Sequence, residues 1–423
     1  MKARHPRAAV LTVVAEGFLG RLTFGMVTFA LPLYARSLGL SMTEIGLLIS
    51  LRSVLELALK PPAGWLADRI GVRQVYLGGG FARVLAAAAL LLPGGFLALA
   101  SVRALQGVSG AGRDVASLSV IARDAPTRVG GVFGWYTTAR QMGNVAGAGV
   151  AGLAIAAADG SFEPLFLLVL ALSVVPMAAV WVGLREIPAA HPHPRPGPAE
   201  RHTPVTDAPL PAGKRLAGFV ALTRELAAPA SVGVLVSMGA FMVHGLFPVI
   251  ATEYAGLSEA EAGLIYTLSA VVLLVSGPAF GWLIDRYGRL IGLAWRSTAN
   301  IGSSLLYLAF PNFAGLALAR AVDDSGKAAF RPAWAAAMAQ LAGADPRRSG
   351  QRLGVLDASQ SLGETVGPVL AGLLWQSGGG VVALFSVRIV IALVAEVTSL
   401  YAFGEIHMPR LRRRGSSRVV GEP

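Results

Sequence analysis

Twelve long apolar stretches limit most strongly what this chain can fold into. Each is about 20 residues or longer, the length that an α-helix needs to cross the hydrocarbon core of a bilayer. Only 14% of all residues are charged, against roughly 25% in an average soluble domain. The sequence therefore predicts an all-α membrane protein with 12 transmembrane helices. The expected spans are 8–34, 43–67, 74–92, 95–121, 129–157, 162–184, 228–253, 259–284, 290–310, 312–341, 350–376 and 381–404.

The first of these stretches begins like a secretory signal, because Lys2, Arg4 and Arg7 precede a short apolar run. The apolar character continues past Glu16 and Arg21. We therefore expect an uncleaved first span.

The sequence lacks cysteine and the motifs that would indicate an enzyme. The absence of cysteine removes disulfides, Cys-ligated zinc, iron–sulfur clusters and thiol nucleophiles. Gly147, Gly149 and Gly152 match a dinucleotide-binding fingerprint formally. No strand precedes them, so close helix packing explains these glycines better. We predict neither an enzyme nor a bound cofactor.

Basic residues gather in the loops on one side of the predicted spans, and the opposite loops hold Arg36 as their only cation. By the positive-inside rule we expect both termini and the long central loop in the cytoplasm, which predicts a multi-pass protein of the inner (plasma) membrane. The net charge of +12 then reflects orientation, so no nucleic-acid partner is expected. The basic tail is expected to face anionic lipid at the cytoplasmic surface.

Residues 185–227 connect the sixth span to the seventh and are rich in proline over most of their length. His191, His193 and His202 suggest a weak metal site. A stiff proline-rich chain cannot easily wrap imidazoles around one ion, so we favour a solvated linker and predict no metal. Apolar residues at helical spacing between 216 and 226 suggest a helix that lies at the membrane interface.

The sequence repeats itself at a spacing of 217 residues. Segment 64–71 reads GWLADRIG after the second span, and segment 281–288 reads GWLIDRYG after the eighth. Matching halves of six spans predict a duplicated transporter. The expected organisation is a six-helix bundle at 1–184, a cytoplasmic linker with an interfacial helix at 185–227, a second bundle at 228–404 and a basic tail at 405–423.

In these motifs the chain resembles the major facilitator superfamily, over about residues 8–404. Its loop pattern Gly-x-Leu-x-Asp-Arg-x-Gly appears once in each half, and Arg103, Gln106 and Gly107 in the fourth span look like the family's Arg-x-x-Gln-Gly pattern. The family's exporters often carry Gly-x-x-x-Gly-Pro in the fifth span, whereas here the pattern ends at Pro368 in the eleventh. The resemblance implies two pseudo-symmetric six-helix bundles. Spans 1, 4, 7 and 10 would line the centre, spans 2, 5, 8 and 11 would flank it, and the other four would face lipid.

The repeated loop motif predicts a gate at the cytoplasmic face. Each aspartate comes where a span ends, so it can accept hydrogen bonds from helix N-terminal amides or from the next arginine and latch the halves in one state. A sharp turn without a gating role is the alternative. The predicted gate residues are Gly64, Asp68, Arg69, Gly71, Arg73, Gly281, Asp285, Arg286 and Gly288.

Many ionisable residues lie inside the predicted spans, where each costs on the order of 2.5–3.5 kcal/mol unless it is paired or hydrated. Arg52, Glu56 and Lys60 are spaced four residues apart and share one helix face. The tenth span repeats this spacing twice between residues 320 and 327. Such ladders fit a structural role and a transport role equally well. Together they imply a polar, water-filled cavity.

By the resemblance, charged residues of the central and flanking spans are candidates for this cavity. The substrate-cavity candidates are Arg21, Arg113, Asp114, Arg140, Asp323, Asp324, Lys327 and Arg331. The proton-coupling candidates are the single carboxylates Glu56, Asp357 and Glu364. His244 is more simply explained by packing. The expected structural pairs, or groups that reach toward the membrane surface, are Arg83, Arg296, Arg388 and Glu396.

These features favour a secondary active transporter that moves a small polar or anionic solute by alternating access. Proton-coupled export (antiport) is the first hypothesis, and proton-coupled uptake (symport) of an organic anion is the second. A membrane sensor or scaffold that does not transport is the alternative from another class, although a scaffold has no reason to keep costly charges in the bilayer. The expected partners are the solute, protons and the lipid bilayer, and the chain is expected to be a monomer.

Overall fold

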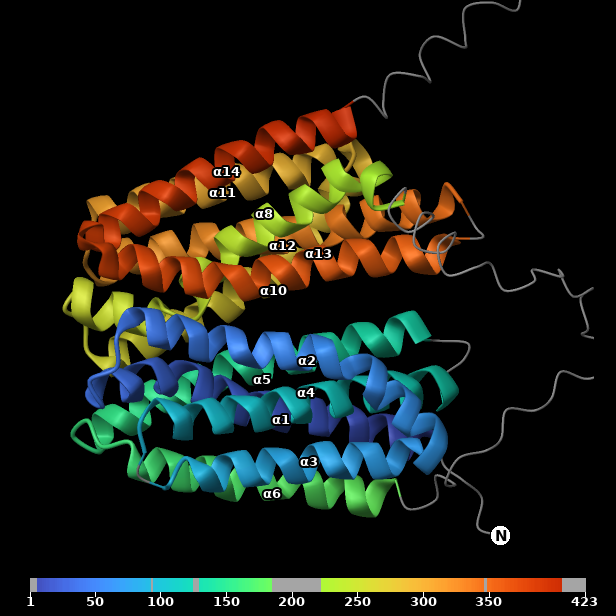
Figure 1. The fold of residues 1–423 in the computed structure, drawn as a ribbon, viewed down its shortest axis with the longest axis vertical. Coiled ribbons are helices and arrows are strands. Elements are labelled where there is room, and N and C mark those ends of the chain that lie inside the picture. The colour runs from blue at the N-terminus through green and yellow to red at the C-terminus, as the bar shows by residue number, and fades with distance from the viewer. Residues whose placement is uncertain (1–5, 93, 125–128, 185–221, 346–347, 405–423) are drawn as a thin grey trace, which may run out of the picture.

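The computed structural model describes residues 6–92, 94–124, 129–184, 222–345 and 348–404. Within these residues it contains helices and no strand, arranged in two groups that lie one above the other in Figure 1. The first half holds α1 (Pro6–Ser37), α2 (Met42–Ile70), α3 (Val72–Ala89), α4 (Phe96–Asp124), α5 (Val129–Ala157) and α6 (Glu163–Gly183). The second half holds α8 (Ala227–His244), α9 (Phe247–Val249), η1 (Ile250–Tyr254), α10 (Glu259–Tyr287), α11 (Leu290–Ala309), α12 (Phe313–Gly343), α13 (Ser349–Leu374), η3 (Trp375–Gly379) and α14 (Gly380–Gly404).

The predicted all-α fold with 12 spans is confirmed, and each expected span falls on a helix within a few residues. The seventh span is the main difference, because α8 ends at His244 and the chain continues as the short helices α9 and η1. The eleventh span likewise ends in a π-helical turn, η3, before α14 begins. Hydropathy does not reveal the break after His244, because mostly apolar residues continue through it, whereas η3 falls where the expected eleventh span gives way to the twelfth.

Length and composition alone mark five segments of the described chain as able to cross a bilayer. They are Ala9–Ser37, Glu163–Gly183, Ala227–His244, Glu259–Tyr287 and Ser349–Gly404, the last of which holds both α13 and α14. Helices α2, α4 and α12 are long enough but carry several charged residues in their middles. Some of those charges line the cavity between the two halves, and others form ion pairs inside one half.

The repeat is visible in the local structure of α2 and α10, which occupy matching positions. Each helix begins with a capping box, formed by Ser41 with Glu44 in α2 and by Ser258 with Glu261 in α10. The glycines after each helix end, Gly71 and Gly288, have φ values of 102° and 92°, a region that favours glycine. The predicted sharp turn is therefore present in both halves.

The helices have two kinds of end, which we name the linker end and the closed end. The linker end is where α6 ends and α8 begins, on the right of Figure 1, and the loops that follow α2 and α10 lie there as well. The closed end is where α1 ends and α2 begins. Its name refers to the close packing between the two halves that is found there.

Glycines form the packing seam between the halves at the closed end. A Cβ atom added to Gly152 of α5 would lie 2.4 Å from the carbonyl oxygen of Glu259 and 2.8 Å from the Cα of Gly263 in α10. A Cβ added to Gly372 of α13 would lie 2.3 Å from the carbonyl oxygen of Met42 in α2. The backbones therefore approach as closely as only small residues allow. The α5–α10 and α13–α2 contacts are equivalent under the sequence repeat.

The hydrophobic core has the same asymmetry between the two ends. The largest cluster of buried apolar residues joins both halves and includes Phe29, Leu48, Phe247 and Ile265. Two smaller clusters each lie within one half and do not bridge to the other. The two halves are thus held together at the closed end.

Several expectations fall outside the described residues. They concern most of the linker with its three histidines, the basic tail with its lipid contact, and most of the interfacial helix at 216–226. The described part of that last segment places Leu222 and Leu226 in buried positions.

Candidate functional site

A cavity of about 940 Å³ lies between the two halves. Its walls come from α1, α2, α4 and α5 in the first half and mainly from α8, α10, α12 and α13 in the second. These are the spans that the family resemblance places at the centre and its flanks. The lining reaches Lys60 on α2, Phe133 on α5 and Asp357 on α13, all toward the linker end.

The charge ladder of α2 is formed as its spacing predicts. Glu56 accepts a short hydrogen bond from Arg52, and its other oxygen lies 3.6 Å from the Lys60 ammonium. Lys60 also lies 3.9 Å from Asp114 of α4, which in turn binds Arg140 of α5 at 2.9 Å. Five charged groups from three helices thus form one connected network along the first-half wall of the cavity.

A second network in the first half is centred on Glu16 of α1, which is only 1% exposed. Its carboxylate accepts hydrogen bonds from Arg83 of α3 at 2.9 Å, Arg113 of α4 at 2.7 Å and Tyr76 of α3 at 2.7 Å. Burial of a carboxylate is tolerated when its charge is neutralised and its oxygens are hydrogen-bonded. Arg113, predicted as a cavity residue, is therefore held by Glu16. The Glu16 carboxylate ties three helices together, α1, α3 and α4.

The second half has its own buried network around two adjacent aspartates of α12. Asp323 binds Arg296 of α11 at 3.1 Å, Arg388 of α14 at 2.6 Å and Lys327 at 2.6 Å. Asp324 binds Arg320 at 3.1 Å and Lys327 at 2.8 Å. Arg296 and Arg388 thus form structural ion pairs, one of the two roles expected for them. The same holds for Arg83.

Four predicted residues line the cavity with neither an ion pair nor a hydrogen bond among the described residues. They are the cations Arg21 and Arg331 and the acids Asp357 and Glu364. Arg21 instead packs on Phe24, with its guanidinium carbon 5.0 Å from the ring centroid. Such groups are the ones most available to a solute or to a proton, because no partner within the protein has to be displaced.

His244 also lines the cavity, at the end of α8. Its ring lies 5.5 Å from the ring of Phe241 and 6.4 Å from that of Tyr266. The Tyr266 hydroxyl donates to the carbonyl oxygen of His244 at 2.6 Å. Tyr266 thereby hydrogen-bonds to one of the backbone carbonyl oxygens that lose their helical partner where α8 ends.

The motif of the fourth span ties α4 to α2. Arg103 is 2% exposed and donates to the carbonyl oxygen of Leu48 at 3.1 Å and to the side-chain oxygen of Gln106 at 2.9 Å. A Cβ added to Gly107 would lie 2.8 Å from that of Leu55. The motif therefore fixes the approach of the two helices beside the cavity.

The predicted gate residues lie at the linker end. Asp68 and Asp285 are exposed and form no ion pair among the described residues. Arg69 instead packs on Trp65, with 4.0 Å between the guanidinium carbon and the ring centroid, and Arg286 packs on Trp282 at 5.6 Å. In this conformation the aspartates hold neither half to the other.

Of the other gate residues, Arg73 binds a neighbouring helix and two glycines have open space around them. Arg73 donates to the carbonyl oxygen of Trp181 on α6 at 3.2 Å. Gly64 and Gly281 face open space.

Sequence reasoning missed an ion pair that joins the halves at the closed end. Arg36 donates to Glu253 through two nitrogens at 2.7 Å and 3.1 Å, and the two residues are 217 positions apart. They are therefore equivalent under the repeat. A search for opposite charges at that spacing would have found the pair.

The cavity lining has more cations than acids. Nine arginine or lysine side chains and five aspartate or glutamate side chains contribute to it. No group of three potential metal ligands occurs in the part of the chain that the structure describes. The described lining therefore carries an excess of positively charged side chains.

The sequence model of the Major Facilitator Superfamily matches residues 17–232 and 229–418. MdtD of Salmonella dublin, named as a multidrug resistance protein, is 29% identical over 174 residues, which cover 41% of this chain and 37% of that protein. MdtD of Salmonella typhi is 35% identical over 102 residues, or 24% of this chain and 22% of its own length. The chain thus matches about a fifth to two fifths of these relatives.

Solved structures match over nearly the whole chain. The nucleoside transporter NupG aligns with a TM-score of 0.75 at 14% identity and covers 93% of this chain and 100% of its own. A POT family transporter in complex with 5-aminolevulinic acid gives 0.72 at 14% identity, with 96% and 97% covered. A bacterial homologue of the human lysosomal transporter Spinster, in an inward-facing and unoccupied conformation, gives 0.68 at 17%, with 94% and 95% covered. At such low identity these likenesses describe the fold.

Proposed function

This chain belongs to the major facilitator superfamily and is a transport protein rather than an enzyme, and from this we propose that it carries a small anionic solute across the membrane by alternating access. The observation that carries the proposal is the excess of cations in the central cavity, nine against five carboxylates. Cations that line a low-dielectric cleft attract anions and repel other cations. A bulky lipophilic cation does not suit such a surface.

We propose that the linker end faces the cytoplasm of a cell bounded by an inner membrane. The basic residues of the loops support this orientation under the positive-inside rule. The cavity extends toward that end, and the glycine seam and the Arg36–Glu253 pair lie at the other. The conformation described here is then inward-facing, and the solute exchanges with the cytoplasm.

Export in exchange for protons is the direction we propose. The multidrug resistance names of the sequence relatives support export. Glu364 of α13 is the favoured proton carrier, because it lines the cavity half-buried and without an ion pair among the described residues, whereas Asp357 on the same helix is exposed. Protonation of Glu364 then removes a charge that no ion pair holds. Glu56, by contrast, is neutralised by two cations. Uptake by symport is the alternative, distinguished by the same assay.

The test is a transport assay on purified protein in liposomes that contain a pH-sensitive dye. A panel of organic anions is added under an imposed pH gradient, and both solute and proton movement are recorded. Solute and protons moving in opposite directions support antiport, whereas movement in the same direction supports symport. No movement of any solute contradicts the transport proposal and favours a sensor or scaffold.

Proton coupling through one residue is tested by Glu364→Gln. The variant should keep solute exchange and lose accumulation driven by the pH gradient, because the amide cannot take up a proton. Glu163→Gln is the matched control, since Glu163 is exposed at the start of α6 and lies outside the cavity. Full gradient-driven accumulation by Glu364→Gln contradicts the assignment of this carboxylate.

A further inference from the structure

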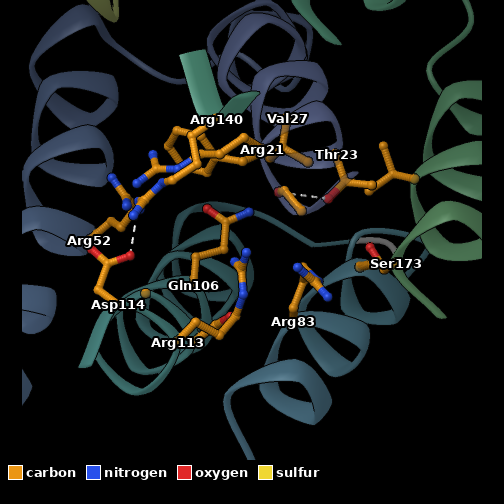
Figure 2. Close-up of a pocket in the computed structure, with 16 residues that line it drawn as sticks. Arg21, Thr23, Val27, Arg52, Arg83, Gln106, Arg113, Asp114, Arg140 and Ser173 are labelled. Atoms are coloured by element: carbon orange, nitrogen blue, oxygen red, sulfur yellow. Dashed lines mark hydrogen bonds and ion pairs between the residues drawn. The ribbon is translucent and has the colours of Figure 1, made fainter. Parts of the chain in front are cut away.

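A small recess of about 40 Å³ opens off the first-half side of the central cavity. The two spaces share part of their lining, including Arg21, Phe24 and Asp114. Figure 2 shows Arg21, Arg52 and Arg140 together on one side of the recess, with Gln106 beside them. Five helices each contribute one arginine to its walls: Arg21, Arg52, Arg83, Arg113 and Arg140.

The five arginines differ in how far the protein already neutralises them. Arg83 and Arg113 share the carboxylate of Glu16. Arg52 and Arg140 each have one carboxylate partner, and the neighbouring Lys60 shares those same two carboxylates. Arg21 has no ion pair within the described residues. The five arginines and the neighbouring Lys60 are six cations, and their carboxylate partners Glu16, Glu56 and Asp114 are three, so positive charge is in excess at the recess.

Two of the residues that line the recess carry unused hydrogen-bond donors. Arg52 Nε and two nitrogens of Arg83, Nε and Nη2, are buried without a hydrogen-bond partner among the described residues. Buried donors without partners each cost roughly 1–3 kcal/mol. The oxygen of the Gln106 amide accepts from Arg103 at 2.9 Å, so its NH₂ group remains as a further donor.

Phe24 holds two of the positive charges near one another. The guanidinium carbons of Arg21 and Arg52 lie 5.0 Å and 4.2 Å from the centroid of its ring. Cation–π contact supplies only part of the compensation that two neighbouring like charges need. An anion between the arginines would supply the rest.

We propose that this recess binds the tetrahedral, doubly charged oxyanion head of the transported solute, as found in phosphate monoesters. Guanidinium groups bind oxyanions through paired N–H donors, and here they come from α1, α2 and α5. A tetrahedral head offers three terminal oxygens to three guanidiniums, whereas a carboxylate offers two. Its two negative charges offset more of the positive excess at the recess than a single carboxylate would. The inference rests on the proposed transport of an anion, with the larger cavity holding the remainder of the solute.

The test measures binding of simple anions to the purified full-length protein by calorimetry at pH 8, where phosphate is mainly a dianion. Phosphate and sulfate should bind and compete with each other. Succinate, which has the same charge but two planar carboxylates, should bind at least about 10-fold more weakly. Acetate should not bind measurably. Succinate that binds as tightly as phosphate contradicts the tetrahedral assignment.

Substitution of Arg21 locates the binding to the recess. Arg21→Gln should weaken phosphate binding about 10- to 100-fold, because it removes hydrogen bonds between charged groups. It leaves no carboxylate without a partner, so folding should be retained. Arg21→Lys keeps the positive charge but loses the paired N–H donors, so its phosphate affinity should be intermediate. It serves as the second variant if Arg21→Gln does not fold. Arg224→Gln, at an exposed arginine outside the recess, is the matched control. Unchanged phosphate affinity in both Arg21 variants overturns the proposal.

The outcomes for the recess and for transport are separable. If carboxylate solutes accumulate in liposomes while phosphate neither binds nor inhibits, the recess inference fails and the transport proposal stands. If no solute moves but phosphate binding depends on Arg21, the recess stands and the transport proposal fails.

Discussion

A single methyl group at the closed-end seam should shift the conformational equilibrium of the whole protein. Gly152→Ala places a Cβ 2.4 Å from the carbonyl oxygen of Glu259, so α5 and α10 must separate by about 1 Å to reach ordinary contact. Overpacking of this kind costs about 1–3 kcal/mol. The contact joins the two halves, so the cost falls only on the conformation in which the closed end is sealed.

The expected size of the shift follows from that difference. A penalty of about 1–3 kcal/mol on one of two states changes their ratio by about 5- to 150-fold. Gly372→Ala should have a similar effect through α13 and α2, because its added Cβ would lie 2.3 Å from the Met42 oxygen. Gly134→Ala is the control on the same helix as Gly152, because Gly134 has open space around it.

The assay uses the absence of cysteine from the chain. A single thiol introduced by Thr28→Cys, which lines the cavity, is labelled with a membrane-impermeant maleimide supplied from the side of the closed end. Labelling should be faster in Gly152→Ala and Gly372→Ala and unchanged in Gly134→Ala. Equal labelling rates in all variants, with intact folding, would refute the idea that this seam separates during transport.

Three further predictions concern named charged groups. Arg36→Gln should speed thiol labelling from the closed end by no more than about 5-fold, because an ion pair whose side chains are 35% and 37% exposed contributes about 0–1 kcal/mol. High salt should remove the difference between the variant and the parent protein. An effect that does not depend on salt argues against the ion pair as its cause. Glu16→Gln should lower the unfolding free energy by about 3–5 kcal/mol, because it leaves two buried guanidiniums without their carboxylate. Denaturant unfolding in detergent measures this loss. A loss below about 1 kcal/mol contradicts the role of Glu16 as a structural centre. Asp68→Asn and Asp285→Asn should slow solute exchange in liposomes with nearly unchanged solute affinity, because each aspartate acts only in the state that seals the linker end. An equal loss of solute binding contradicts a latch role for these two aspartates.

The fold was predictable because the membrane restricts it so strongly. Length and hydropathy locate the spans, and the 217-residue repeat of GWLADRIG in GWLIDRYG pairs them into two halves. The charge ladder of Arg52, Glu56 and Lys60 was predictable as well, because spacing along one helix determines which side chains meet. These inferences depend only on local geometry.

Partners on different helices were not predictable in the same way. The meeting of Glu16 with Arg83 and Arg113, and of Asp323 with Arg388, depends on how three helices pack. One sequence does not carry that information. The break between α8 and η1 was missed for a related reason, since apolar residues continue through it. Helix packing, rather than composition, determines which arginines form ion pairs and leaves Arg21 without one among the described residues.

The Arg36–Glu253 pair also determines which halves can assemble with each other. Both residues occupy the same place in their own half, so two first halves brought together at this face would set arginine against arginine. Two second halves would set glutamate against glutamate. Like charges in direct contact disfavour such pairings. The duplicated halves are therefore complementary partners, and separately produced first and second halves should associate with one another in preference to themselves.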